Sequence, residues 1–276
     1  MDKGNEIVVW IKNVKGVLAI AALICFPWQA ICAGVEGIPY KNWLKYKETV
    51  QKDPSLVIYY TLEEGEGNQI ENRAGAGNAS MYDADNRGGL WVEGRWPEKR
   101  ALFFDDGAIQ AKGYNIENNR FTCELWIKKK GAGKIGAGMS GTLIGVEGFY
   151  AGWRIITSYA SSNGKIESQV GQKAGAYSVS SASVSDNVWH HVAVTWDGEK
   201  IIIYIDGKPA VEKKSMGDYV AVDPALGVLC VGYGHFGVGS VKVEVDEVAI
   251  YNRALSKEEI KQHRYLIQEG IPCVLD

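Results

Sequence analysis

The sequence predicts an all-β protein built as a sandwich of antiparallel sheets. Two β-branched and aromatic runs, Trp189–Trp196 and 201–205, are each followed by an Asp-Gly dipeptide, which favours tight turns with positive φ. Similar short runs recur along the chain with Gly, Asn and Ser between them, at the strand spacing of a sandwich or barrel. An aromatic share of 11%, with 9 Trp and 14 Tyr, also suits strands.

The two central runs form a β-meander whose two faces both carry bulky side chains. Val192, Val194 and Trp196 alternate with smaller or polar neighbours, while Ile201–Ile205 is bulky at every position. We therefore expect this ribbon inside a curved sheet that is covered on one side and shaped to contact something else on the other.

Length and charge limit the classes of protein to consider. The chain of 276 residues fits one sandwich domain, because all-β domains often reach 200 to 250 residues. A net charge of -3, without a cluster of Lys and Arg beside aromatic residues, argues against nucleic-acid binding.

The first 33 residues resemble a secretory leader. Three lysines precede the apolar run 17–28, and Ile31-Cys32-Ala33 supplies acceptable residues for cleavage after Ala33. The run is shorter than the roughly 20 residues that span a bilayer. We expect export to the periplasm, the cell surface or the medium, and an uncleaved membrane anchor is the alternative.

Three cysteines follow this leader. Export permits a disulfide, but an odd number leaves one thiol unpaired or intermolecular. Cys123 shares a strand face with apolar neighbours and Cys230 lies in another strand-like run, so core thiols are the preferred interpretation. The pairing of Cys273 stays open.

The remaining chain divides into short strands and two helices. Residues 42–52 have helical spacing and form part of an N-terminal helical arm, residues 34–55. The glycine-rich segment 68–89 is interpreted as a surface loop at a sheet edge. The capping box Ser256-Lys-Glu-Glu259 begins a C-terminal helix, and residues 271–276 form a tail. Further strands are expected at 55–62, 120–129, 142–146, 152–156, 165–170, 226–234 and 241–251, and residues 100–110 are expected to form a strand, an acidic turn and a second strand.

Several motifs in their chain order carry a family resemblance over roughly residues 56 to 268. Together they resemble the LamG-like jelly-roll domains of the concanavalin A-like lectin/glucanase superfamily. The resemblance implies a two-sheet antiparallel jelly-roll sandwich over residues 56–270 and use as an exported module that binds carbohydrate or protein. The motifs are Phe104-Asp-Asp-Gly107, Phe121-Thr-Cys-Glu-Leu-Trp126, Trp189-His-His-Val-Ala-Val-Thr-Trp-Asp-Gly198, Tyr204-Ile-Asp-Gly-Lys208 and Val245-Asp-Glu-Val-Ala-Ile-Tyr-Asn-Arg-Ala-Leu-Ser256.

Glu244 and Asp246 raise the question of glycosidase activity, because related glucanases carry alternating carboxylates on one strand face and need two facing carboxyl groups. On a regular strand Val248 occupies the next position of that face and Glu247 points away. We therefore predict no catalytic residue. His190 and His191 are adjacent on a strand, so they point to opposite faces and cannot share one site.

Calcium is the one cofactor that stays open. Asp105 and Asp106 form the best local cluster of hard oxygen ligands, with Asp83 and Asp85 as further candidates. Asp in such turns also caps its own backbone.

For ligand contact we expect an aromatic platform in loop-rich segments beside amide or acid side chains. The sequence therefore indicates a non-catalytic module whose partner is a glycan or a surface protein; a structural envelope or assembly protein is the alternative, and a glycoside hydrolase comes third. The platform candidates are Tyr150, Trp153, Tyr177, Tyr233, His235 and Phe236.

Overall fold

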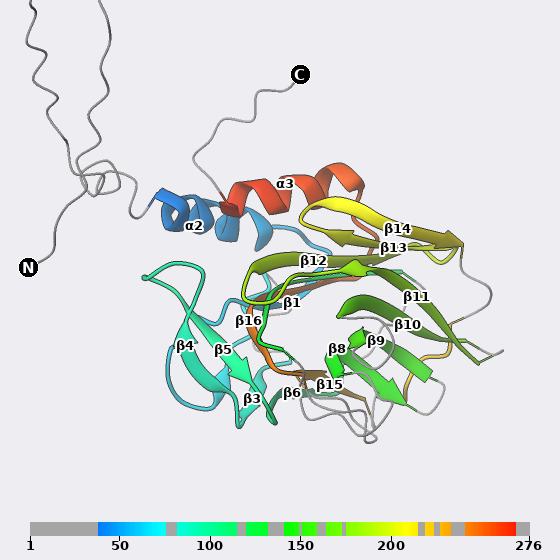
Figure 1. Cartoon of the computed structure of the whole chain (residues 1–276), viewed down its shortest axis with the longest axis horizontal. Helices are drawn as coiled ribbons and strands as arrows, with labels where there is room; N and C mark the ends of the chain where they lie inside the picture. The colour runs from blue at the N-terminus through cyan, green and yellow to red at the C-terminus, as the bar shows by residue number, and fades with distance from the viewer. Residues whose placement is uncertain are drawn as a thin grey trace, which may run out of the picture. The chain divides into compact units, whose positions relative to one another are not determined.

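The computed structural model describes residues 38–75, 82–114, 120–131, 141–148, 151–158, 164–172, 175–214, 219–223, 227–232 and 241–268 (Figure 1). The chain divides into two units, Met1–Glu36 and Gly37–Asp276, and every described residue belongs to the second. The predicted leader and tail lie outside the described residues. Within the described ranges, no helix is both long enough and apolar enough to span a membrane.

Two antiparallel sheets confirm the predicted jelly-roll sandwich. Sheet A has the strand order β14-β13-β12-β7-β16-β5-β4, with β1 paired to β16, and sheet B has the order β11-β10-β9-β8-β15-β6-β3-β2. The strands of sheet A are β1 (Leu56–Tyr60), β4 (Leu90–Glu93), β5 (Arg100–Phe104), β7 (Phe121–Lys129), β12 (Trp189–Trp196), β13 (Lys200–Ile205), β14 (Lys208–Lys214) and β16 (Val243–Tyr251). The strands of sheet B are β2 (Gln69–Ile70), β3 (Ala84–Arg87), β6 (Ala108–Lys112), β8 (Gly141–Gly148), β9 (Ala151–Ser158), β10 (Lys165–Gln172), β11 (Gly175–Ser183) and β15 (Val228–Val231).

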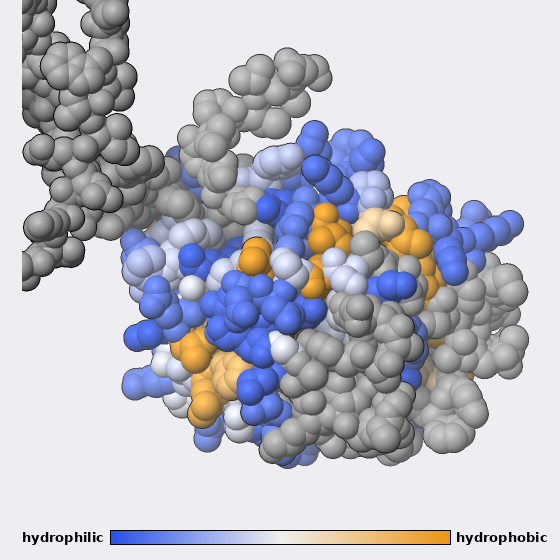
Figure 2. All heavy atoms as spheres, in the orientation of Figure 1, coloured by the Kyte–Doolittle hydropathy of each residue, from blue (hydrophilic) through white to orange (hydrophobic). Residues whose placement is uncertain are grey.

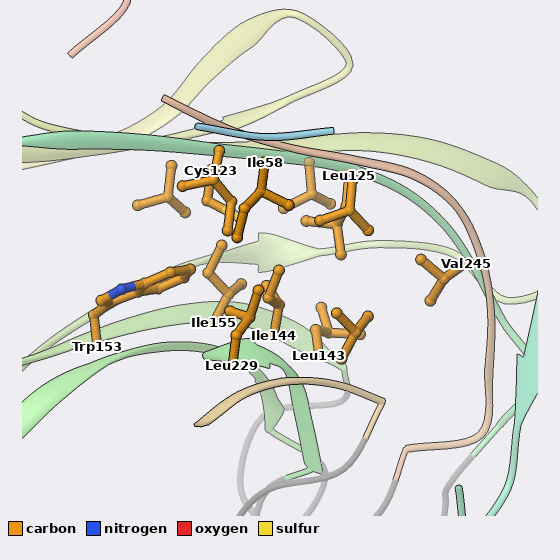
Figure 3. Packing of buried hydrophobic residues seen from close by; sticks show 14 of the residues in the cluster. Ile58, Cys123, Leu125, Leu143, Ile144, Trp153, Ile155, Leu229 and Val245 are labelled. Atoms are coloured by element: carbon orange, nitrogen blue, oxygen red, sulfur yellow. The ribbon is translucent and has the colours of Figure 1, made fainter. Parts of the chain in front are cut away.

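The main core lies between the two sheets. Alternate residues of each strand point inward, as the period of two requires, and the buried side chains of both sheets meet in one apolar layer (Figure 3). Cys123 and Cys230 are both buried. Cys123 belongs to this core, as predicted, whereas Cys273 lies outside the described residues. The labelled core residues are Ile58, Cys123, Leu125 and Val245 from sheet A and Leu143, Ile144, Trp153, Ile155 and Leu229 from sheet B.

The predicted meander is present as β12 and β13, with Trp196 paired to Ile201 across the first turn. Asp206 and Gly207 both have positive φ, 52° and 74°, as a tight turn before β14 requires. The second face of this ribbon, whose contact partner the sequence left open, is covered by the two helices. The ribbon's inner face packs in the core, and its outer face lies against buried residues of the two helices.

Helices α2 (Ile38–Val50) and α3 (Lys257–Gln268) lie over the outer face of sheet A (Figure 1). The spacing of Trp43, Tyr46 and Val50 places all three on the buried side of α2, so the N-terminal arm is packed on the sandwich. Helix α3 begins with the predicted capping box: the Glu259 amide donates to the Ser256 hydroxyl at 3.2 Å, and the Ser256 amide donates to the Glu259 carboxylate at 2.8 Å.

The segment 68–89 differs from its interpretation as a loop. It contributes β2 and β3, which form one edge of sheet B. The residues of β3 are Ala-Asp-Asn-Arg, which have low strand propensity. Pairing with β6 on one side and β2 on the other holds them extended, so tertiary context overrides the local preference.

Candidate functional site

Asp246 and Glu247 lie side by side on the outer face of sheet A, contrary to the prediction that Glu247 points away. Glu247 has a φ of 51°, and the pairing of β16 with β7 shifts register between Asp246 and Val248. This bulge adds one residue to the outer face. Val248 therefore points into the core.

These two carboxylates are buried and paired with cations. Arg95 donates from Nε to Asp246 at 2.7 Å and from its terminal nitrogen to Glu247, and Lys99 contacts Asp246. Trp43 Nε1 and the Tyr59 hydroxyl donate to Glu247 at 2.5 and 2.6 Å. Both carboxylates thus belong to a covered network beneath α2, and neither faces a cleft as glycoside hydrolysis would require.

The remaining polar groups of this covered face centre on Glu124. His263 of α3 contacts Glu124 at 2.9 Å and His191 lies 3.7 Å from it. Burial lowers the pKa of His191 to about 4, although Glu124 acts in the opposite direction. Burial also opposes a charge on His263, but Glu124 outweighs it and raises the pKa of His263. The ion pair between His263 of α3 and Glu124 of β7 therefore helps to hold α3 on the sheet.

His190 lies apart from His191, as predicted. Its Nε2 is 2.8 Å from the Ser185 hydroxyl and its Nδ1 is 2.8 Å from Asp206. Ser185, His190 and Asp206 are thus arranged like the nucleophile, base and acid of a catalytic triad. However, Ser185 does not line either of the two cavities among the described residues. Asp206 also accepts the His191 amide at 3.0 Å, so these bonds fasten the β13–β14 turn to β12.

A small cavity of about 10 Å³ lies between Tyr46 of α2 and the outer face of sheet A. Its walls include Tyr46, Glu124, His191 and Glu247. The volume is that of about one water molecule, so the cavity has no room for a sugar or a larger ligand.

A polar row crosses the outer face of sheet B. Each member is the register partner of the next. The residues on either side of the four central members, on β6, β15, β8 and β9, belong to the core between the sheets. Six strand spacings of about 4.8 Å give the row a length of roughly 29 Å. The polar row consists of Gln69, Asp85, Gln110, Cys230, Gly145, Arg154 and Gln169, contributed by β2, β3, β6, β15, β8, β9 and β10.

Hydrogen bonds fix the orientation of several members of the polar row. Arg154 Nε donates to Gln169 at 2.6 Å, and Gln169 donates to Glu167 at 2.8 Å. Gln69 donates to Asp85 at 2.9 Å at the other end. Between them the row contains Gly145, which has no side chain, and Cys230, which is 2% exposed.

A pocket of about 280 Å³ opens at the Asp85 end of the polar row. This volume is near the lower limit of small-molecule sites. Tyr82 is its one aromatic wall, and the charges of its lining include both signs. The lining residues are Tyr82, Asp83, Asp85, Arg87, Gln110 and Lys112.

The predicted aromatic platform is not assembled from the described residues. Trp153 is wrong as a ligand contact, because its ring is 2% exposed and packs 4.8 Å from Phe121 in the core. The backbone of Tyr177 lies in β11 opposite Val170, and its side chain is outside the described part. The other platform candidates also lie outside the described residues: Tyr150, Tyr233, His235 and Phe236.

The predicted calcium ligands Asp105 and Asp106 lie in the turn between β5 and β6, where Asp105 is 3.8 Å from Lys242 Nζ. Asp83 instead accepts the Asn72 amide at 2.7 Å, and Asp85 belongs to the polar row. The described residues contain no group of three or more His, Cys, Asp or Glu side chains suited to a metal. Calcium binding stays a prediction.

Sequence reasoning did not select Gln110, Arg154 or Gln169. Each is a polar residue that alternates with core residues on its strand, which marks it as outward-facing. The alternation alone does not show that they are neighbours, because β6, β15 and β8 are adjacent in sheet B but far apart in the sequence.

Solved structures with the same fold include toxin binding domains and one domain of an arabinanase. The binding domain of Paraclostridial Mosquitocidal Protein 1 matches with a TM-score of 0.61 and 18% identity, over 79% of this chain and 52% of that one. The binding domain of Botulinum Neurotoxin DC, in complex with SialylT, matches with a TM-score of 0.56 and 15% identity, over 78% of this chain and 51% of that one. The chain therefore spans about half the length of these toxin domains.

Domain 4 of AbnA, a GH43 extracellular arabinanase from Geobacillus stearothermophilus, was solved in complex with arabinotriose. It matches with a TM-score of 0.58 and 16% identity, over 76% of this chain and 98% of that domain. At these identities the likeness shows the fold. No curated protein matches the chain in sequence.

The family assignment rests on the sequence itself. A family model described as "Concanavalin A-like lectin/glucanases superfamily" matches residues 104–261, which is more than half of the chain and includes the motifs from the Phe104 turn to α3. The chain therefore belongs to the concanavalin A-like lectin/glucanases superfamily.

Proposed function

We propose that this protein is an exported, non-catalytic module that binds a glycan across the outer face of sheet B. The observation that carries the proposal is the polar row, a line of register partners from Gln69 to Gln169 with polar side chains towards both ends and a pocket at one end. A row of roughly 29 Å would contact several units of a linear oligosaccharide.

The chemistry of the polar row suits sugar hydroxyl groups. Gln110 and Gln169 carry both donors and acceptors, Arg154 supplies donors only, and Asp85 accepts. The bonds from Arg154 to Gln169 and from Gln69 to Asp85 hold these groups in place before binding. Less side-chain entropy is then lost when a ligand binds.

The covered network supports the non-catalytic part of the proposal. Of the two carboxylates that related glucanases would use, Asp246 is paired with Arg95 and Lys99 beneath α2. The other, Glu244, is paired with Lys128 and Lys130. Access of a sugar to Asp246 would require α2 to leave the sheet and both ion pairs to break, at a cost of several kcal/mol.

An assembly role would be favoured by a long apolar edge or patch. On the face shown in Figure 2, hydrophobic residues form separate areas among hydrophilic ones. Among the described residues, the large hydrophobic side chains that are exposed lie on three different segments: Leu90 on β4, Val188 before β12 and Tyr265 on α3. Single exposed apolar residues of this kind are ordinary on protein surfaces, so glycan binding is the better supported function.

Binding of the purified chain to a glycan array tests the proposal, with calcium and with a chelator in parallel. The double variant Arg154→Ala and Gln169→Ala removes the best-ordered pair of the polar row, and Lys45→Ala on the exposed side of α2 is the control. We expect binding by the wild type and by the control, with at least a tenfold loss in the double variant, since each lost hydrogen bond is worth about 1 kcal/mol or more.

Two results would count against this proposal. Equal binding by the double variant and the wild type would move the site away from sheet B. Absence of binding to every glycan on the array would remove carbohydrate as the ligand class for the glycans tested. Loss of binding in the chelator alone would assign calcium a role and direct attention to Asp105 and Asp106.

A further inference from the structure

Lys99 and Asp246 form an ion pair that is sealed from solvent in the covered network. Both side chains have 0% exposure, and Lys99 Nζ contacts Asp246 Oδ1 directly. Lys99 immediately precedes β5 and Asp246 lies in β16, its hydrogen-bonded neighbour in sheet A. An amine and a carboxyl group are therefore held together by two paired strands, although 147 residues separate them in sequence.

The surroundings of this pair position both groups. Lys99 Nζ donates to the Thr61 carbonyl at 2.6 Å and lies 4.8 Å from the centre of the Trp43 ring. The other oxygen of Asp246, Oδ2, accepts the Nε–H of Arg95 at 2.7 Å. The amine thus lies on one side of the carboxyl group, and a fixed cationic donor holds the oxygen on the other side.

The network buries two cations and two anions: Arg95, Lys99, Asp246 and Glu247. Removing charges from water costs several kcal/mol for each ion. Condensation of Lys99 with Asp246 would remove one charge of each sign and leave Arg95 paired with Glu247. The charge balance of the site is therefore the same before and after such a reaction.

We propose that Lys99 and Asp246 are joined by an intramolecular isopeptide bond that forms after folding. A proton first passes from the Lys99 ammonium to Asp246 Oδ1, which gives a neutral amine and a neutral acid. The lone pair of Nζ then attacks Cγ to form the new N–C bond. A further proton moves from nitrogen to Oδ1, the Cγ–Oδ1 bond breaks, and one water molecule leaves.

Arg95 is the residue that stabilises the intermediate of this reaction. Negative charge develops on Oδ2 when Nζ attacks, and the Arg95 Nε–H already lies against that oxygen. Glu247 accepts a hydrogen bond from a terminal nitrogen of Arg95 and so holds the guanidinium group in place. Exclusion of water by Trp43 and α2 disfavours the reverse hydrolysis.

The bond would cross-link distant parts of the chain. It closes a loop of 147 residues, and long loops gain the most stability from a cross-link because it restricts the unfolded chain. This amide would be a covalent brace between the start of β5 and β16, two neighbouring strands of sheet A. The inference does not rest on the proposed glycan binding.

Mass spectrometry of the purified chain under denaturing conditions tests the bond directly. We expect the tryptic peptide 96–100, uncleaved after Lys99, joined to the peptide 243–253, with the pair lighter than its two parts by one water. The nearby pair of Lys128 and Glu244 is a matched control in the same peptide. It is partly exposed, with side chains 19% and 9% exposed, and should remain uncoupled.

The variant Lys99→Arg keeps the positive charge but cannot form this amide, so its mass should equal that of its sequence. Quantitative recovery of separate wild-type peptides, with normal cleavage after Lys99, would overturn the proposal. So would attachment of peptide 243–253 through Glu244. Because the wild-type result decides the question alone, poor folding of the variant would not affect the test.

Discussion

Acidification should destabilise the fold through His191, the buried histidine between sheet A and α3. Burial lowers its pKa from the ordinary 6.5 to about 4. In the unfolded chain the ring takes up a proton near the ordinary value, whereas in the folded protein it resists protonation down to about pH 4. The neutral ring therefore contributes stability above the ordinary pKa, and this contribution is lost as the pH falls from there towards the folded value.

The size of the loss follows from the pKa difference. A shift of about 2.5 pH units, at about 1.4 kcal/mol for each unit, corresponds to roughly 3 kcal/mol lost by pH 4. His191→Gln keeps a polar side chain of similar length but cannot titrate, and it keeps the backbone amide that donates to Asp206. Urea denaturation at neutral and acid pH gives the free energy of unfolding of both proteins.

We expect the wild type to lose roughly 3 kcal/mol more than His191→Gln between about pH 7 and pH 4. All other acid-sensitive groups are common to the two proteins, so the difference isolates this ring. Equal losses in both proteins would refute the account, because they would show that His191 has the same pKa in the folded and unfolded states.

His263 provides an internal contrast of opposite sign. Its pKa is raised by Glu124, so its contribution to stability is present below the ordinary value and is lost as the pH rises through the folded value. His263→Gln should therefore lose as much free energy of unfolding as the wild type when the pH falls to about 4. It should lose less than the wild type when the pH rises above the ordinary pKa of histidine. A variant that removed both losses would mean that the two rings act as one unit through Glu124.

Three further predictions concern packing, capping and the thiols. Trp43→Phe removes the hydrogen bond to the Glu247 carboxylate and should lower the free energy of unfolding by about 1.5–3 kcal/mol. The control Lys45→Ala on the same helix should change it by less than about 0.5 kcal/mol. Equal effects of the two variants in urea denaturation would mean that α2 is not docked as described. Ser256→Ala should cost about 1 kcal/mol by removing the cap of α3, and a calorimetric scan without a change would contradict the capping box. Burial raises the pKa of the Cys123 thiol, so peptide mapping after thiol labelling should find Cys123 and Cys230 modified only in denaturant; labelling of the native protein would contradict their burial.

Much of the fold could be predicted because local signals and packing agree. The Asp-Gly turns, the alternation that separates Cys123 from Trp126, and the capping box of α3 all act over a few residues. The error at Glu247 has a physical cause: strict alternation assumes a regular strand, and one residue with positive φ moves its side chain to the other face.

The candidate site could not be predicted in the same way. The polar row depends on the register of seven strands. Gln110 on β6 and Arg154 on β9 come into the same row only because β15 and β8 pair between these two strands. Aromatic residues in loop-rich segments suggested a different surface. Trp153 shows why that signal is weak, since a large ring on a strand is as well suited to the core as to a ligand.

The most direct test of the central claim is a backbone amide NMR titration of the isotope-labelled chain with the glycan that it binds best on the array. Shifts should concentrate on the strands of the polar row, above all at Asp85, Gln110, Arg154 and Gln169, and should spare α2 and α3. Shifts concentrated at the helices, or the absence of any shift at glycan concentrations that saturate binding, would contradict the assignment of the ligand surface to sheet B.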